Sequence, residues 1–379
     1  MFCKRRKRKG TNIFIGDRKT SFERMEKNFK HEREYEIVNQ TKGRASLQYN
    51  QPPKLISAAS IVGSKEGDGP LGHLFDCIEP DPKFGKNTWE EAESELQLRT
   101  ARKAMDKAGL NEEQVRYLFA GDLLAQGIAT SYGLMELQIP LFGLYGACST
   151  CGESLSLASM AVNAGYADCV MAITSSHFAS AEKEFRFPLE YAGQRPLSTT
   201  WTVTGSGAFL LAAGESPFAK RASVCIAGIT TGKVIDYGVK DSMHMGAAMA
   251  PAAADTIYQH LTDFGRNAED YDRIITGDLG SIGQTILKDL MRERGIELGD
   301  IHEDCGMLIY DPDTQDTHAG GSGCGCAAST LAAYILPKLV RGEWKRVLLV
   351  PTGALLSKVS FNEGQSIPGI AHGVVLEHV

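Results

Sequence analysis

The 379-residue sequence contains no long hydrophobic run. A helix that crosses a bilayer needs about 20 consecutive apolar residues, and no stretch of the chain approaches that length. The basic residues at the start are not followed by the apolar segment that a secretory signal peptide requires either. The sequence therefore predicts a protein that is soluble, or that is attached to a membrane only from outside.

Most of the chain lacks excess positive charge. Residues 1–50 contain 14 Lys and Arg against 6 Asp and Glu, and since the whole chain carries a net charge of −6, the remainder carries about −14. Such a negative charge on the residues after position 50 argues against general nucleic-acid binding, so no nucleic-acid partner is expected. Residues 1–40 open with the run Lys4-Arg5-Arg6-Lys7-Arg8-Lys9 and have few apolar positions. We interpret them as a basic, disordered extension, either a solvated tail or an arm that binds a membrane or a partner.

The cysteines do not form a disulfide framework. Nine is an odd number, and the nine are scattered through an apolar sequence rather than regularly spaced in a short one. Reduced thiols are therefore expected.

An internal repeat divides the body of the chain into two related halves. Residues 111–123 match residues 267–279 without a gap at an offset of 156, and the helices expected before them, 95–110 and 251–266, keep that offset. Cys148 and Cys324 each precede a helix rich in small residues and then a β-branched strand, at an offset of 176. Repetition of this length implies a duplicated unit, so we expect halves at 41–230 and 231–379.

Short apolar runs indicate the strands. LISAASIVG reads as a buried strand bounded by Pro and Gly, and TWEE at 88–91 has the spacing of a capping box that starts a helix to about residue 108. Six further runs are apolar on both faces, as in strands covered by helices: YLFAG, LFGLYG, CVMAITS, GAFLLAA, RIITG and VLLVPTG. Helical connections favour parallel pairing, so the expected fold class is α/β, layered α/β/α/β/α with pseudo-twofold symmetry. Ligands of such folds bind at the carboxyl ends of strands, where Cys148 and Cys324 are expected.

Cys148 stands where a helix is expected to begin. The first turn of a helix presents unpaired N–H groups and partial positive charge, which either lower the pKa of a thiol and make it a nucleophile or hold a carboxylate without reaction. A small buried apolar residue is the third interpretation.

Cys148 and Cys151 with Cys324 and Cys326 could supply four thiolates to zinc, but Cys151 falls inside an apolar helix. A redox CxxC is disfavoured because its usual elbow sequence is absent. We expect no metal and no cofactor.

Two segments resemble catalytic segments of one superfamily. GACSTCGESLSLASMAVNAGYAD resembles the nucleophile helix of thiolases and β-ketoacyl synthases, and AGGSGCGCAAS resembles the glycine-rich turn that carries a later active-site residue. A more specific resemblance, over about residues 41–379, is to the stage V sporulation protein AD family of endospore-forming bacteria. It is carried by GPLGHLFD, TWEEAES, ITSSHFASAEKEFRFPLEY, AAADTIYQH, TQDTHAGGSGCGCAAS and PTGALLSKVSFNEGQSIP.

This resemblance implies a thiolase-like fold and a homodimer. It implies binding of dipicolinic acid (pyridine-2,6-dicarboxylate), free or as its calcium chelate. It further implies uptake of this solute into the forming spore and its release on germination. The protein would be the soluble subunit of a membrane channel assembly, beside other SpoVA membrane subunits. It would lie in the forespore or spore, soluble or peripheral at the spore inner membrane.

The residues at the supporting catalytic positions differ from those of condensing enzymes. Such enzymes combine Cys with two His, or with His and Asn, to form the thiolate and hold the oxyanion. Aligned on the resemblance, the first supporting position falls at Gly277-Asp278 and the second at Cys324. We therefore expect binding without turnover and no catalytic residue. The alternative is an acyltransferase or thioesterase that uses Cys148.

A dianionic aromatic acid needs hydrogen-bond donors, positive charge and a slot for its ring. The N–H groups of Cys148 and Ser149 are candidate donors, and the Gly-Ser-Gly at 205–207 is expected to form a tight turn that a ligand can approach. Asp278 would repel a dicarboxylate unless calcium or a proton intervenes. The candidate cations are His177, Arg195, Lys233, His244 and His318, among which Arg195 and His318 rank first because they flank Gly or Pro turns. The predicted ligand-binding set is Cys148, Ser149, His177, Arg195, Gly205, Asp278, His318 and Cys324.

Overall fold

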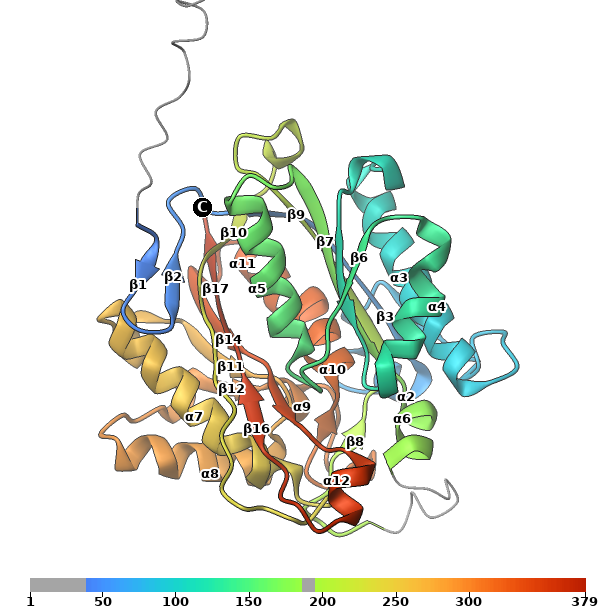
Figure 1. Ribbon diagram of the computed structural model, residues 1–379, viewed down its shortest axis with the longest axis vertical. Coiled ribbons are helices and arrows are strands. Elements are labelled where there is room, and N and C mark those ends of the chain that lie inside the picture. Colours follow the sequence, from blue (N-terminus) through green and yellow to red (C-terminus); the bar gives the residue numbers. More distant parts are fainter. Residues whose placement is uncertain (1–38, 186–194) are drawn as a thin grey trace, which may run out of the picture. The chain divides into compact units, whose positions relative to one another are not determined.

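The computed structural model describes residues 39–185 and 195–379 (Figure 1). The predicted basic extension, residues 1–40, lies outside the described residues except for its last two. Residues 40–379 form one compact unit, so the division of this body at residue 230 stays a prediction. In the part of the chain that the structure describes, no helix combines the length and the apolar character needed to cross a membrane.

The first half is built on five strands in the order β3-β9-β7-β5-β6. Their bounds are Lys54–Gly63 (β3), Leu118–Gly121 (β5), Leu141–Gly143 (β6), Cys169–Ser176 (β7) and Gly205–Ala212 (β9). All five overlap runs that the sequence predicted as strands. β9 runs antiparallel to β3 and β7, whereas β5 runs parallel to β7 and β6.

The second half repeats this plan in the order β10-β17-β14-β11-β12. Its strands are Val224–Thr230 (β10), Arg273–Thr276 (β11), His302–Asp304 (β12), Arg346–Val350 (β14) and Gly373–His378 (β17). The directions match as well, because β17 is antiparallel to β10 and β14 while β11 is parallel to β14 and β12. The halves join where Cys225 of β10 pairs with Lys54 of β3. The predicted pseudo-symmetric duplication is confirmed.

Parallel pairing holds for only part of each half. The chain between β7 and β9 leaves and re-enters the sheet at one end, since Ser176 pairs with Gly205, and β9 must therefore run antiparallel. The chain between β14 and β17 does the same, with Leu349 opposite Val374.

Helices cover both faces of each half-sheet and give five layers. The central layer is α5 (Thr150–Asn163) and α10 (Cys324–Thr330), the latter continuing through a π-helical turn (Leu331–Ile335) into α11 (Leu336–Val340). The outer layers are α3 (Trp89–Ala108) with α4 (Ile128–Leu134), and α7 (Met245–Phe264) with α8 (Gly280–Glu293) (Figure 1). On β7, Val170 and Ala172 face the central layer while Met171 and Ile173 face α3.

The remaining elements are short. Strands are Thr41–Lys42 (β1), Ser46–Gln48 (β2), Cys77–Glu79 (β4), Trp201–Thr202 (β8), Gly321–Ser322 (β13), Thr352–Ala354 (β15) and Gly369–Ala371 (β16); helices are Ser64–Gly67 (α2), Phe178–Phe185 (α6), Cys305–Leu308 (α9) and Lys358–Asn362 (α12). The predicted capping box is confirmed: Thr88 accepts from the backbone N–H of Glu91, whose side chain accepts from the N–H of Thr88.

The central helix α10 packs against β9 so closely that no side chain fits between the two backbones at the contact. A Cβ on Gly207 would lie 2.5 Å from the backbone of Ala328, and one on Gly325 would lie 2.2 Å from the carbonyl oxygen of Gly205. The prediction of a tight turn at 205–207 is wrong, because these residues begin β9. Their small size serves this close packing, which fixes the first turn of α10 and with it Cys324.

Candidate functional site

Cys148 occupies a tight elbow before α5. Ala147, directly before it, has a φ of 50°, a left-handed conformation that is unfavourable for a residue with a Cβ. Ser149 is the N-cap residue of α5, but its hydroxyl caps no backbone N–H: both the hydroxyl and the backbone N–H of Ser149 donate to the carbonyl of Gly146, at 2.7 and 3.1 Å. The strained turn presents the Cys148 side chain, 7% exposed, to a cavity between the two halves of the fold.

The two cysteine elbows of the repeat meet at this point. Cys148 and Cys324 pack in one cluster with Leu123, Ala181 and the partly buried Phe185. The thiol of Cys324 is fully buried and donates to the backbone carbonyl of Ser175 at 2.9 Å. Cys324 therefore serves as a buried contact that ties α10 to β7.

Asp278 lies behind the Cys148 thiol and hydrogen bonds with it. One carboxyl oxygen of Asp278 accepts from the N–H of Gly323 at 2.9 Å, and the other accepts from the hydroxyl of Thr352 at 2.7 Å. Burial raises the pKa of Asp278 to about 7, although these hydrogen bonds oppose the shift. The carboxyl therefore holds a proton over much of the acid range.

The environment of Cys148 disfavours its thiolate. Burial, followed by the charge and hydrogen bond of Asp278, raises the pKa of the thiol well above its ordinary value of 9.0, and the Gly323 N–H opposes this only in part. The lowered pKa that a nucleophile at a helix N-terminus would have is not found. The reason is that desolvation and a neighbouring carboxyl outweigh the helix terminus.

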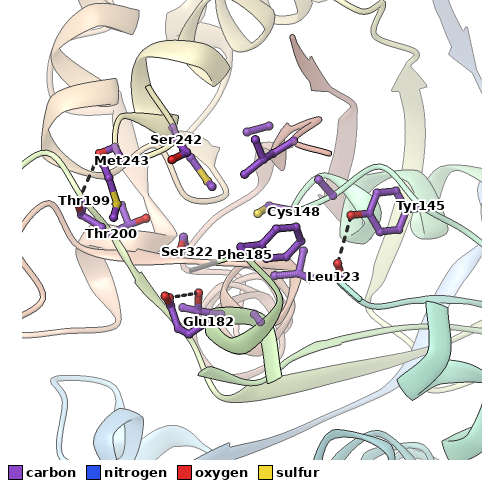
Figure 2. A pocket seen from close by; sticks show the side chains of 16 residues that line it. Leu123, Tyr145, Cys148, Glu182, Phe185, Thr199, Thr200, Ser242, Met243 and Ser322 are labelled. Carbon is purple, nitrogen blue, oxygen red and sulfur yellow. Dashed lines mark hydrogen bonds between the residues drawn. The ribbon is translucent and has the colours of Figure 1, made fainter. Parts of the chain in front are cut away.

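The cavity above Cys148 is narrow, with a volume of about 60 Å³, below the range of about 300–1,000 Å³ usual for small-molecule sites. One wall is apolar and the other carries hydroxyl groups (Figure 2). The apolar and aromatic lining is Leu123, Tyr145, Ala147, Ala181, Phe185, Met243, Met245, Ala354 and Leu356; the hydroxyl lining is Thr199, Thr200, Thr202, Ser242 and Ser322. Among the described residues that line it, none is Lys, Arg or His.

Glu182 is the acidic side chain that lines the cavity in the part of the chain that the structure describes. It lies on α6, is 1% exposed, and accepts a hydrogen bond from the Thr202 hydroxyl at 3.1 Å (Figure 2). Our sequence interpretation missed it. The sequence feature that could have revealed Glu182 is its spacing from Phe178 and Phe185, which places all three side chains on one side of the short helix.

His177 does not reach the cavity. Its Nε2–H donates to the carbonyl of Pro82 at 2.7 Å, its Nδ1 accepts from the N–H of Ala179 at 3.1 Å, and its ring lies beside Trp89. Burial lowers its pKa. Both ring nitrogens thus hold the start of α6 in place.

Arg195 and His318, the two cations ranked first, come together at Asp316 instead. Arg195 donates to the Asp316 carbonyl at 2.9 Å, and its guanidinium lies 4.7 Å from the centre of the Trp201 ring. Nδ1–H of His318 donates to the carbonyl of Pro196 at 2.9 Å, and Nε2 lies 3.1 Å from an Asp316 carboxyl oxygen. Neither side chain lines the cavity.

The two remaining candidate cations also lie outside the described lining of the cavity. Lys233 pairs with Asp255 at 3.1 Å, and His244 precedes α7. Of the eight predicted ligand-binding residues, Cys148 lines the cavity, and Asp278 and Cys324 lie directly behind it. The roles of all eight in binding stay predictions. The described residues contain no group of three or more His, Cys, Asp or Glu arranged to hold a metal ion.

Most of the chain is similar to one known protein family. The family described as Stage V sporulation protein AD (SpoVAD) matches residues 43–377. Stage V sporulation protein AD of Bacillus subtilis (strain 168) is 44% identical over 335 residues, which cover 88% of this chain and 97% of that protein.

Solved structures of condensing enzymes share the fold at low sequence identity. 3-Oxoacyl-[acyl-carrier-protein] synthase III from Aquifex aeolicus VF5 has a TM-score of 0.52 at 12% identity, over 86% of this chain and 100% of that one. A variant of OleA from Xanthomonas campestris has a TM-score of 0.55 at 14% identity, over 87% and 99% of the two chains. The tetronic acid condensing enzyme AbyA1 has a TM-score of 0.54 at 16% identity, over 86% and 99%. The predicted thiolase-like fold is confirmed.

Proposed function

Because this chain belongs to the stage V sporulation protein AD family, we propose that it acts in sporulation as a binding protein for dipicolinate and carries out no chemical step on it. The protein takes part in dipicolinate uptake during sporulation and in its release on germination. It works in the spore, soluble or peripheral at the inner membrane, with SpoVA membrane subunits as partners.

The observation that carries this proposal is the pairing of Cys148 with the Asp278 carboxyl. A thiol nucleophile needs a base whose basicity is close to its own. Here the pKa of the thiol lies well above 9.0 and that of the acceptor is about 7, so proton transfer from sulfur to the carboxylate is unfavourable. The described lining of the cavity offers no imidazole in its place.

The cavity suits a small flat acid. Phe185 and Leu123 provide apolar contact for a ring, while the hydroxyls of Thr200 and Ser322 can donate to a carboxylate (Figure 2). The thiol of Cys148 lies at the floor, where it limits the depth to which a ligand enters.

Calorimetry with dipicolinate, with and without calcium, tests the proposal. Binding at a stoichiometry of one is expected in at least one of the two conditions. Cys148→Leu, which fills the floor of the cavity, is expected to weaken that binding at least tenfold. Cys169→Ala is the matched control, since Cys169 is buried on β7 against α3. Absence of heat at millimolar ligand with folded protein contradicts the proposal.

A second candidate function is acyl transfer through a Cys148 thioester. It is favoured by the access of this thiol to the cavity and by its hydrogen bond with a titratable carboxyl. Incubation with acyl-CoA followed by intact-mass analysis distinguishes the two functions. The acyltransferase gives an acyl adduct that Cys148→Ala abolishes, whereas the binding protein keeps its mass.

The protein also forms a homodimer through β6 in this proposal. β6 ends the described sheet, and Leu141, Phe142 and Tyr145 on and after it are 39%, 52% and 45% exposed. An unpaired strand edge with exposed apolar side chains is a template for pairing with another chain. A second copy related by a twofold axis would continue the sheet across this edge.

A further inference from the structure

The short helix α6 forms one wall of the cavity at Cys148, to which it contributes Phe185 (Figure 2). Because the cavity has a volume of only about 60 Å³, the position of this wall decides what can enter it. Ser180 of the same helix contacts Glu93 of α3, and the two residues are 1% and 0% exposed. A change in the charge of Glu93 therefore acts directly on a helix that shapes the cavity.

The hydrogen bonds at Ser180 require a proton on Glu93. Oγ of Ser180 lies 2.6 Å from Oε2 of Glu93 and 3.0 Å from the carbonyl oxygen of His177. A hydroxyl has one hydrogen to donate, and neither a carboxylate nor a carbonyl can donate one. Both contacts are hydrogen bonds at the same time only when the Glu93 carboxyl is protonated and donates to Ser180, which then donates to His177. The other carboxyl oxygen, Oε1, accepts from the Ser175 hydroxyl at 3.0 Å, since that hydroxyl in turn accepts from the Gln97 amide at 3.2 Å.

The groups that face Glu93 also favour its neutral form. Burial, followed by the charge of Asp122, raises the pKa of Glu93 to about 8, and its hydrogen bonds with Ser180 and Ser175 oppose the shift only in part. Lys183 carries positive charge nearby on α6, but it pairs with Glu90 at 2.7 Å. The further titratable groups around Glu93 in the described part of the chain are Glu184 on α6, His177 before it and the buried thiol of Cys324 on α10.

The direction of the pH dependence follows from this environment. When α6 moves away and water reaches Glu93, its pKa returns toward the ordinary value of 4.5, whereas with α6 in place it is about 8. Between these values the docked state binds a proton that the released state has lost. Docking of α6 is therefore most stable below pH 4.5 and weakens as the pH rises to about 8.

We propose that Glu93 makes the wall of this cavity a pH-sensitive switch: its protonated carboxyl holds α6 against α3 through Ser180, and loss of the proton releases α6 and opens the cavity at Phe185. The ionised carboxyl faces Asp122, and the single hydrogen of Ser180 then serves only one of its two acceptors. The inference concerns the wall alone and does not depend on the ligand that the cavity takes.

Hydrogen exchange of the full-length protein, followed by mass spectrometry at pH 6.0 and pH 8.5, tests the inference. After correction for the chemical exchange rate at each pH, the protection of the α6 amides in the wild type is expected to fall at least tenfold relative to that of α5. Glu93→Gln carries a permanent N–H donor and is expected to lose this pH dependence. Glu95→Gln is the matched control, because Glu95 lies on the same helix and pairs with Lys86 at 3.0 Å. It is expected to keep the dependence of the wild type.

The wild-type measurement decides the inference even if Glu93→Gln does not fold. Equal protection of α6 at the two pH values, relative to α5, overturns it. So does a loss of protection that α5 and α6 share equally, which reports global unfolding, or a pH dependence that persists in folded Glu93→Gln. No ligand is added in this experiment, so these results leave the proposed function intact, and a failure of dipicolinate to bind leaves the inference intact.

Discussion

The thiol of Cys148 hydrogen bonds with the carboxyl of Asp278, a contact that joins the two halves of a duplicated fold. Asp122 occupies the equivalent position in the first half but serves a local purpose. Its carboxyl accepts from the N–H of Leu124 at 2.8 Å and from the N–H and hydroxyl of Thr130 at 2.7 and 2.6 Å. The duplicated carboxyls have therefore diverged, one to shape a loop and the other to hold the thiol at the cavity floor.

The first prediction concerns the reactivity of Cys148. Since only the thiolate reacts with iodoacetamide, the raised pKa of this thiol predicts that its alkylation at pH 7.5 is much slower than that of an unperturbed thiol. Asp278→Asn removes the neighbouring carboxylate and is expected to speed the reaction. Peptide mass mapping over time measures both rates. Cys148 in urea-unfolded protein is the control and reacts at the ordinary rate; a rate in the folded protein equal to or faster than this control would contradict the raised pKa.

The second prediction concerns stability against pH. The folded-state pKa of Asp278 is about 7 and its ordinary value is 3.8, so between these values the folded state binds a proton that the unfolded state has lost. The stabilisation is complete below pH 3.8 and declines as the pH rises to about 7. Asp278→Asn removes this dependence. From pH 5 to 7.5 the wild type is expected to lose about 2 kcal/mol more unfolding free energy than the variant.

Urea unfolding at the two pH values measures this difference. Glu93, whose pKa is raised to about 8 by burial and by Asp122, gives a slope of the same sign. It is present in both proteins and therefore cancels. An identical pH dependence in wild type and variant would place the pKa of Asp278 near its ordinary value.

Local sequence patterns were enough to predict the scaffold. The apolar runs that became β5, β7 and β14 owe their strand character to their own residues, and the capping box at Thr88 depends on two side chains three positions apart. The duplication was visible because residues 111–123 and 267–279 align without a gap.

The site was less predictable because the orientation of its side chains depends on contacts with residues that are distant in the sequence. Arg195 is held by Asp316 and Trp201, and no local pattern shows that its guanidinium turns to them. The Gly-Ser-Gly at 205–207 has the composition of a turn, yet its small residues serve contact with Ala328, more than a hundred residues later. Glu182 reaches the cavity because α6 buries one face.

The third prediction tests that backbone contact. A Cβ on Gly207 would lie 2.5 Å from the backbone of Ala328, which cannot rotate away as a side chain would. Gly207→Ala is therefore expected to lower the free energy of unfolding by about 1–3 kcal/mol, the usual cost of overpacking. Gly214→Ala is the control, because its nearest neighbour would be the carbonyl oxygen of Pro52 at 3.7 Å. Chemical denaturation compares the two, and equal midpoints would mean that β9 and α10 can separate at little cost.

The last prediction concerns assembly through β6. The ring of Phe142 stacks on Phe119 with 5.1 Å between centres, and at 52% exposure its outer face is open to solvent. A second copy paired along β6 would bury this ring and the backbone groups of the strand edge together. Light scattering after size exclusion is expected to give twice the 41.1 kDa of one chain for the wild type.

A Phe142→Lys variant is expected to run as a monomer, because a charge at the centre of the interface would be desolvated without a partner. Val340→Lys, at an exposed position on α11 in the other half, is expected to remain a dimer. A wild type that is monomeric at micromolar concentration, or a Phe142→Lys variant that remains a dimer, would contradict pairing through β6.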